Sequence, residues 1–266
     1  MNTPVQLDNV QHGTVQLERK KGASLTYSWI GGDTIGHTLV VFLNGLVMPQ
    51  AMWAATMKAI VQKCAAGGRP CPSMLSYDRY GQGRSDPDPL DHDKPGGQTH
   101  DVADTVKDLH EFLEQIGSSH TSHEHLVFVC NSIGCAVARL YAQSYPGTVN
   151  GMILLDSVLA NSDFVSVFPD PDSANFNEGE LPEDVTKDDL RMAREKARRV
   201  FHPSVPNPER LNRATLQQLL PHAATPRLQG PDGRGPFLTI VGHDWDVFSR
   251  ENKVSAVMNK SCVELC

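Results

Sequence analysis

The most informative segment of the chain reads His125-Leu-Val-Phe-Val-Cys-Asn-Ser-Ile-Gly-Cys-Ala-Val-Ala-Arg-Leu-Tyr141. Its first half is apolar and β-branched, which predicts a buried strand, and its second half is rich in small residues, which predicts a closely packed helix. The two are joined only by Cys130-Asn131-Ser132-Ile133-Gly134. A serine in so sharp a turn presents its hydroxyl at the end of a sheet, which is the geometry of a nucleophile elbow.

An elbow serine needs a base, and this sequence offers few. The hydroxyl is a poor nucleophile until a neighbouring group removes its proton, and that group is normally a histidine that follows the last strand. The last histidine of this chain is His243, with little sequence after it. Ser132 therefore predicts nucleophilic catalysis, and the identity of its base is an open question.

Length, charge and hydropathy narrow the class of protein. The chain has 266 residues, enough for one large α/β domain with or without a lid, and its net charge is −7. That charge argues against a nucleic-acid or anionic-membrane surface, and no apolar run reaches the roughly 20 residues of a membrane span. Residues 1–6 also lack the features of a secretory signal. We therefore expect a cytoplasmic protein that binds a small molecule and has no nucleic-acid or membrane partner.

The cysteines predict neither a metal site nor a disulfide framework. Their spacings do not resemble the CxxC pairs of zinc sites, and such thinly spread residues indicate free thiols in a reducing compartment. They are Cys64, Cys71, Cys130, Cys135, Cys262 and Cys266. The acidic, proline-rich residues 87–97 could bind a cation through their carboxylates, but their composition favours a solvated loop.

Strands alternate with helices through the first part of the chain. Apolar runs predict strands over residues 14–19, 25–30, 39–43, 74–77, 125–130, 152–155 and 236–241. Helices are predicted over residues 49–63 and 101–116, the second with an apolar face at intervals of three and four. This alternation predicts an α/β fold with a mostly parallel central sheet and flanking helices.

Residues 157–235 follow a different pattern. One helix start is predicted at Thr186, which two aspartates follow, and a second at Asn207-Pro208, with proline at the first helical position. The apolar side of the second helix would be formed by Leu211, Leu216, Leu219 and Leu220. We expect the core to comprise residues 1–156 and 236–266, with residues 157–235 inserted as a helical lid.

Three motifs in order resemble those of the α/β-hydrolase family. They are Val40-Val41-Phe42-Leu43-Asn44-Gly45-Leu46, Tyr77-Asp78-Arg79-Tyr80-Gly81-Gln82-Gly83-Arg84-Ser85 and the elbow itself. The resemblance covers residues 14–248 and implies the α/β-hydrolase fold. The turn at Leu43–Leu46 and the stretch Gly-His-Asp-Trp-Asp after residue 241 are more similar to small fungal members, many of which act in secondary metabolism.

The resemblance implies roles for individual residues. Ser132 matches the nucleophile, and the N–H groups of Ile133 and Leu46 match the two halves of an oxyanion hole. Two such donors are worth roughly 3–4 kcal/mol each in a dry site. Cys130 replaces the usual glycine two positions before the serine and is small enough for the turn. The motif from Asp78 to Ser85 is usually structural in this family, its glycines permitting turns and its charges tying loops together.

The acid and the base are ambiguous. Asp246 fits the family's spacing for the acid better than its neighbour Asp244, and Asp156, which follows the preceding strand, is the alternative. His243 could serve as the base with Asp156, although it comes one strand earlier than in the family. A second group, His120, His123 and His125, has metal-like spacing but precedes a strand, so we interpret it as part of a solvated loop.

Three hypotheses follow for the function. The first is a serine hydrolase that acts on an ester, lactone or thioester bond of a small apolar molecule and needs no metal or cofactor. The second is a truncated or catalytically impaired relative that binds a small molecule or a partner, because loss of the histidine from a serine triad costs about 10⁶ in kcat. The third is a lyase-like or isomerase-like member that does not depend on this base and uses an aspartate or a cysteine. A missing final strand would leave the sheet with a bare edge, which favours self-association.

Overall fold

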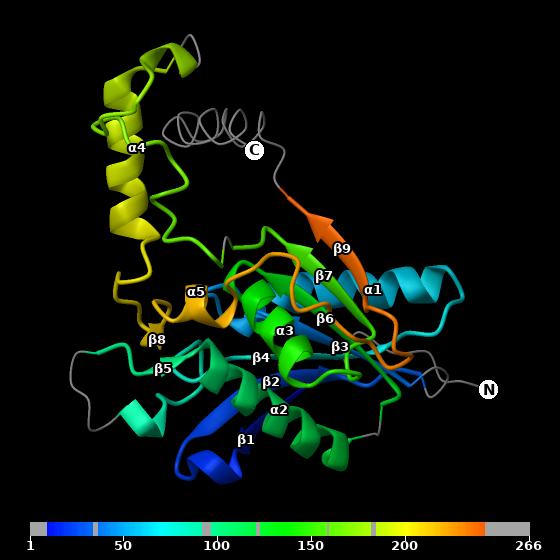
Figure 1. Cartoon of the computed structure of the whole chain (residues 1–266). Helices are drawn as coiled ribbons and strands as arrows, with labels where there is room; N and C mark the ends of the chain where they lie inside the picture. The colour runs from blue at the N-terminus through cyan, green and yellow to red at the C-terminus, as the bar shows by residue number, and fades with distance from the viewer. Residues whose placement is uncertain are drawn as a thin grey trace. The chain divides into compact units, whose positions relative to one another are not determined.

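The computed structural model describes residues 10–33, 37–91, 97–120, 123–158, 160–181 and 185–242 (Figure 1). The chain divides into two compact units, each of which is described by itself. The first unit holds the described residues up to 158 together with residues 206–212 and 222–241. The second holds the described residues of 160–205 and 213–221, with residue 242.

A seven-stranded sheet forms the centre of the first unit, in the order β1-β2-β4-β3-β6-β7-β9. Its strands are β1 (Gln11–Gln16), β2 (Ser24–Ile30), β3 (Thr38–Leu43), β4 (Ser73–Tyr77), β6 (His125–Asn131), β7 (Gly151–Leu155) and β9 (Phe237–Val241). β2 is antiparallel to β1 and β4, and all later pairings are parallel. The predicted mostly parallel sheet is confirmed.

Helices cover both faces of this sheet. Figure 1 shows α2 (Val102–Ser119) and α3 (Ile133–Ser144) together on one face, and α1 (Ala54–Ala66) on the other. α1 continues from the 3₁₀ turn η2 (Gln50–Trp53), and both lie within or close to the predicted helix 49–63. α2 begins with a capping box, in which Asp101 accepts from the N–H of Asp104 and Asp104 accepts from the N–H of Asp101.

Each face of the sheet has its own apolar core. Against α1, the side chains of Phe42, Met74 and Val129 pack on Met57 and Val61 of the helix. On the opposite face, Tyr77 and Phe128 of the sheet meet aromatic rings of α2 and α3, with centroids 4.9 and 5.1 Å apart. Burial of this apolar surface is the dominant stabilisation of the unit.

Two strands differ from expectation in position or exposure. β1 occupies residues 11–16 rather than 14–19, because residues 18–20 form a 3₁₀ turn, η1 (Glu18–Lys20), that buries Lys20. β9 is the last strand in the order of the described sheet, and its five residues are all exposed, Phe237 at 86%. None of the described helices is long and apolar enough to cross a membrane.

The second unit contains the predicted helix at Thr186. α4 (Lys187–Val200) begins with a capping box between Thr186 and Asp189, as the sequence predicts. Its buried face includes Leu190 and Ala197, which pack with Val165 and Phe168. A short helix, α5 (Leu216–Leu219), lies in the same unit.

The prediction of a helix that starts at Pro208 is wrong. Residues 211–212 instead form strand β8 (Leu211–Asn212), which pairs with β5 (His100–Asp101) in the first unit. The Asn207 side chain accepts from the Leu211 N–H at 3.1 Å and donates to the Leu211 carbonyl at 2.9 Å, which closes a turn where a helix would begin. Residues 206–212 and 222–235 therefore group with the core unit, and only part of the expected lid 157–235 lies in the second unit.

Candidate active site

Ser132 is the single residue that connects strand β6 to helix α3. β6 ends at Asn131, α3 begins at Ile133, and the Ser132 backbone has φ 51° and ψ −121°. Residues other than glycine rarely adopt such angles, so the surrounding structure must hold them. The Ser132 N–H donates to the Leu155 carbonyl at 3.1 Å, and the Cys135 N–H donates to the Ser132 carbonyl at 3.0 Å. The sharp turn predicted at this serine is confirmed.

Small residues allow the elbow to approach the neighbouring strand. A Cβ on Gly134 would overlap the Leu43 carbonyl oxygen and lie 2.9 Å from the Asn44 carbonyl oxygen. Both obstacles are backbone atoms, which have no rotamer by which to move aside. Cys130, on the other side of the serine, is fully buried, and its side chain is accommodated. The elbow therefore requires glycine at position 134 and tolerates cysteine at position 130.

The turn after β3 lies beside the elbow. A Cβ on Gly45 would lie 2.7 Å from Oδ1 of Asn131 and 3.5 Å from Cβ of Ser132, so the two turns are in contact. Leu46 is the next residue of this turn. The N–H of Ile133 is the first of helix α3, where no intrahelical acceptor exists. The structure thus brings Ser132 and Ile133 together with the turn that carries Leu46.

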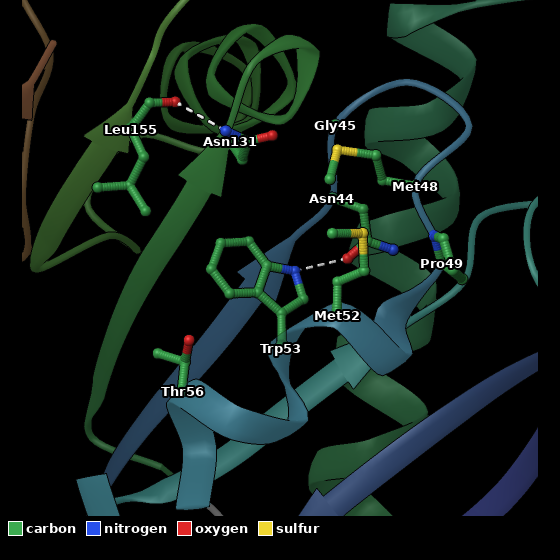
Figure 2. Close-up of a pocket in the computed structure, with 9 residues that line it drawn as sticks. All are labelled: Asn44, Gly45, Met48, Pro49, Met52, Trp53, Thr56, Asn131 and Leu155. Carbon is green, nitrogen blue, oxygen red and sulfur yellow. Dashed lines mark hydrogen bonds between the residues drawn. The ribbon is translucent and has the colours of Figure 1, made fainter. Parts of the chain in front are cut away.

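A pocket of about 200 Å³ opens beside these turns (Figure 2). Its lining is Asn44, Gly45, Met48, Pro49, Met52, Trp53, Thr56, Asn131 and Leu155. The polar groups of Asn44 are already bonded: its amide donates to the Tyr77 carbonyl at 2.8 Å and to Gln82 at 2.9 Å, and its Oδ1 accepts from Trp53 at 2.7 Å. Asn44 therefore braces the turn, and the remaining lining is largely apolar.

The acid and the base are placed only in part. Asp156 follows β7 with φ 49°, is exposed, and donates its N–H to the Val241 carbonyl at 2.9 Å. His243 and Asp246 lie outside the described residues. Within the described part of the chain, the Ser132 hydroxyl has no hydrogen-bond partner.

The histidines around position 123 lie at the wrong end of β6 to act on Ser132. His120 and His123 precede the strand and His125 is its first residue, whereas Ser132 follows its last residue, and seven strand residues span about 20 Å. His120 stacks on Trp29 with centroids 4.6 Å apart, and burial lowers the pKa of His123. His125 is exposed. The interpretation as a solvated loop is therefore wrong for His125, which is the exposed first residue of β6, and for His120, which packs on Trp29 of the sheet.

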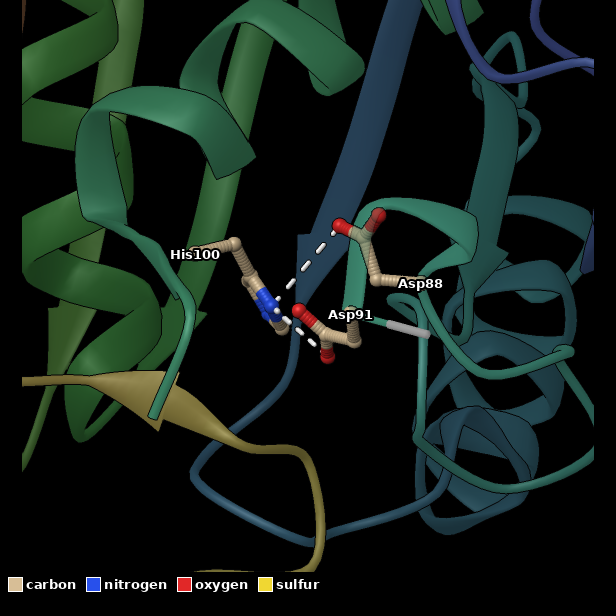
Figure 3. A group of neighbouring side chains, drawn as sticks. All are labelled: Asp88, Asp91 and His100. Atoms are coloured by element: carbon tan, nitrogen blue, oxygen red, sulfur yellow. Dashed lines mark ion pairs between the residues drawn. The ribbon is translucent and has the colours of Figure 1, made fainter. Parts of the chain in front are cut away.

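The interpretation of residues 87–97 as a solvated loop is wrong for its first two aspartates. Asp88 and Asp91 are 1% and 3% exposed. Lys20 forms ion pairs with Asp88 and with Asp108, and His100 Nδ1 lies 3.7 Å from Asp88 and 3.5 Å from Asp91 (Figure 3). Composition could not reveal this burial, because the partners come from η1, β5 and α2.

Among the described residues, Asp88, Asp91 and His100 form a group that could hold a metal ion. Ligand atoms of Asp88, Asp91 and His100 lie within 4.8 Å of one another. However, Asp88 already pairs with Lys20, and Arg210 Nε lies 3.9 Å from Asp91. These cations balance the buried carboxylates, so the arrangement is accounted for as an ionic cluster that fastens the loop to the sheet.

The four described cysteines are free thiols, as expected, and they are Cys64, Cys71, Cys130 and Cys135. Burial raises the pKa of Cys135 to about 11 and that of Cys130 well above its usual range. A thiol must ionise to act as a nucleophile. The two cysteines beside the elbow are therefore poor candidates for nucleophilic catalysis.

This burial predicts a pH dependence for alkylation. Because the pKa of Cys135 is about 11, its thiol stays protonated at pH 8, and iodoacetamide should modify it only as the pH approaches that value. In urea the thiol returns to an ordinary pKa and should react at pH 8. Mass spectrometry of peptides from native and denatured protein measures both, and rapid native modification at pH 8 would contradict the burial.

A family model for the alpha/beta hydrolase family matches residues 40–257. The match spans the turn after β3, the glycine-rich motif, the elbow and β9, in the order in which the fold places them. The chain belongs to the alpha/beta hydrolase family. The comparison with curated proteins gave no match.

Several solved structures of hydrolases are similar to part of this chain. A haloalkane dehalogenase loop variant from Bradyrhizobium elkanii is 18% identical with a TM-score of 0.47. The matched region covers 71% of this chain and 50% of the dehalogenase chain. An alpha/beta hydrolase from a Medee basin deep-sea metagenome library is 21% identical with a TM-score of 0.43, covering 57% and 48%. A laboratory-evolved potato epoxide hydrolase is 18% identical with a TM-score of 0.42, covering 65% and 44%. The chain thus spans about half the length of these proteins.

Proposed function

We propose that the protein is a serine hydrolase of esters, lactones or thioesters. The observation that carries this proposal is the strained backbone of Ser132, which lies in contact with the turn at Gly45. Oγ of Ser132 bonds to the substrate carbonyl carbon, and the oxyanion is stabilised by the N–H groups of Leu46 and Ile133. The leaving alcohol or thiol takes the proton of the serine, and water then releases the acid and restores the hydroxyl.

For the proton transfer we propose His243, oriented by Asp246 or by Asp156. A serine without such a base retains only the roughly 10³–10⁴-fold catalysis that an oxyanion hole and binding supply. His243→Ala should therefore lower the rate at which a fluorophosphonate labels the protein. If that rate is unchanged, His243 is not the base.

The pocket favours a small apolar acyl group. Its volume of about 200 Å³ is below the roughly 300–1,000 Å³ of pockets that enclose drug-sized ligands. The side chains of Met48, Met52 and Leu155 offer no strong hydrogen-bonding groups. A role in secondary metabolism rests on the resemblance to small fungal hydrolases and is part of the same proposal.

The pocket size predicts a chain-length preference. The kcat/KM for p-nitrophenyl butyrate should exceed that for the decanoate by about tenfold or more, because one or two excess methylenes already cost ~1–3 kcal/mol in a closed pocket. Met52→Ala should narrow this difference by enlarging the pocket, whereas Leu90→Ala, at an equally exposed apolar residue outside the pocket, should not. Equal rates across the series would contradict the assignment of this pocket.

A second candidate function is binding without turnover. It is favoured by the Ser132 hydroxyl, which has no hydrogen-bonded base within the described residues. A fluorophosphonate probe separates the two functions, because it reacts rapidly only with an activated serine. Saturable binding of a small ester without labelling would support the second candidate.

A further inference from the structure

A buried carboxylate lies behind the turn that carries Leu46. Glu209 is 2% exposed and comes from the short segment that precedes β8. Its oxygens accept from Arg79 Nε at 3.0 Å, from Gln82 Nε2 at 3.1 Å and from the backbone N–H of Val47. Leaving a carboxylate unpaired at such depth would be strongly destabilising, so this set of donors is required to hold it.

The partners of Glu209 also hold the other side of the turn. Arg79 donates from Nη1 to the Asn44 carbonyl at 2.8 Å and from Nη2 to the Gly45 carbonyl at 3.0 Å. Gln82 donates to the same Gly45 carbonyl at 2.9 Å. Hydrogen bonds therefore hold the backbone on both sides of Leu46. They are accepted by two carbonyls immediately before it and donated by the N–H of Val47 immediately after it.

The backbone around Glu209 is shaped for this contact. Gly81 has φ 75°, and a Cβ on it would lie 3.0 Å from Cα of Glu209, so only glycine lets the two segments approach this closely. Val47 is held at φ 56°, which a β-branched residue adopts only under constraint. The turn is thus held in a conformation that it would not retain alone.

We propose that Glu209 is a positioning residue for the oxyanion hole, acting through Arg79, Gln82 and the N–H of Val47 on the N–H of Leu46. This inference rests on the proposed serine hydrolase function. An oxyanion donor is effective only when it lies about 2.7–3.1 Å from the developing charge, and a 1 Å displacement can cost about 10²-fold in rate. Fixing the backbone on both sides of Leu46 is a direct means of preventing that displacement.

The test is Glu209→Gln, which preserves the side-chain volume. It removes the negative charge and replaces one accepting oxygen with an NH₂ group, which cannot accept from Arg79, Gln82 or Val47. We expect kcat on p-nitrophenyl butyrate to fall about 10- to 100-fold with KM changed less than about twofold, because the oxyanion forms only in the transition state. A trifluoromethyl ketone, which forms an oxyanion adduct with serine, should lose affinity by the same factor. The corresponding methyl ketone should not.

Asp88→Asn is the matched control, because Asp88 is an equally buried, ion-paired carboxylate that does not touch this turn. It should lower stability without changing kcat. Gly81→Ala is a second variant that displaces Glu209 without altering a polar group, and it should reproduce the loss of kcat. Hydrogen exchange of the peptide Leu43–Pro49 should quicken in Glu209→Gln and not in Asp88→Asn.

The outcomes separate this inference from the proposed function. If wild type is labelled by the fluorophosphonate but Glu209→Gln retains full kcat, or if Asp88→Asn loses kcat equally, the positioning role is overturned and the hydrolase stands. Unchanged exchange of the turn in Glu209→Gln overturns it as well. If wild type is not labelled at all, the proposed function fails and this inference fails with it.

Discussion

Ser132→Ala should abolish covalent labelling by a fluorophosphonate and lower ester hydrolysis by at least about 10³-fold. The strained backbone at φ 51° holds Ser132 next to Asn131, which lines the pocket, and the substitution removes the oxygen that would bond to the substrate. In a well-studied serine protease, loss of the nucleophile costs about 2 × 10⁶ in kcat, and the residual rate comes from the oxyanion hole and binding. The measurement is the labelling rate together with kcat on p-nitrophenyl butyrate.

The matched control is Ser144→Ala, at an exposed serine at the end of the same helix. It should label and turn over like wild type. If Ser132→Ala hydrolyses the ester at the wild-type rate, the nucleophile has been assigned wrongly, whatever the fold.

Gly134→Ala should be among the most destabilising single substitutions in the core unit. Its methyl group would overlap the Leu43 carbonyl oxygen and crowd that of Asn44, and neither backbone atom can rotate away. Overpacking costs typically 1–3 kcal/mol, and we expect about 3 kcal/mol here. For a chain of this size that corresponds to a fall in Tm of roughly 6–12 °C.

Gly117→Ala provides the comparison, because a Cβ at this position of α2 meets nothing within 4 Å. It should leave Tm unchanged or raise it, since alanine favours a helix by up to about 1 kcal/mol over glycine. Equal Tm values for the two variants, measured by thermal unfolding, would show that helix α3 does not pack on the end of β3 as described.

The sheet could be predicted because its signals are local. Most strands of the parallel part are apolar runs bounded by polar or glycine residues, and the elbow adds a turn with small residues at fixed offsets from Ser132. The helix expected at Pro208 failed for the opposite reason. Asn207 is a residue type that commonly caps helices, but here its side chain closes a turn on Leu211. The segment then pairs with β5, a strand that is distant in sequence.

The parts of the site that could not be predicted depend on distant partners. Glu209 lies 130 residues after Arg79, and no pattern of sequence spacing joins them. Asp88 and Asp91 occur in a proline-rich stretch whose composition is typical of solvent-exposed loops. They are nevertheless buried, with Lys20 paired to Asp88 and His100 beside Asp91. By contrast, motif order predicted Ser132, Ile133 and Leu46, since backbone N–H groups at a turn depend on position rather than on side chain. The structure brings Ser132 and Ile133 beside the turn that carries Leu46, and their catalytic roles stay a prediction.

The most direct test of the account is to locate the adduct that the fluorophosphonate forms. Wild-type protein is labelled at pH 8, digested, and the modified peptide is sequenced by tandem mass spectrometry. We predict one adduct, on Oγ of Ser132. An adduct on another residue, or none after prolonged reaction, would contradict the claim that this turn presents an activated serine.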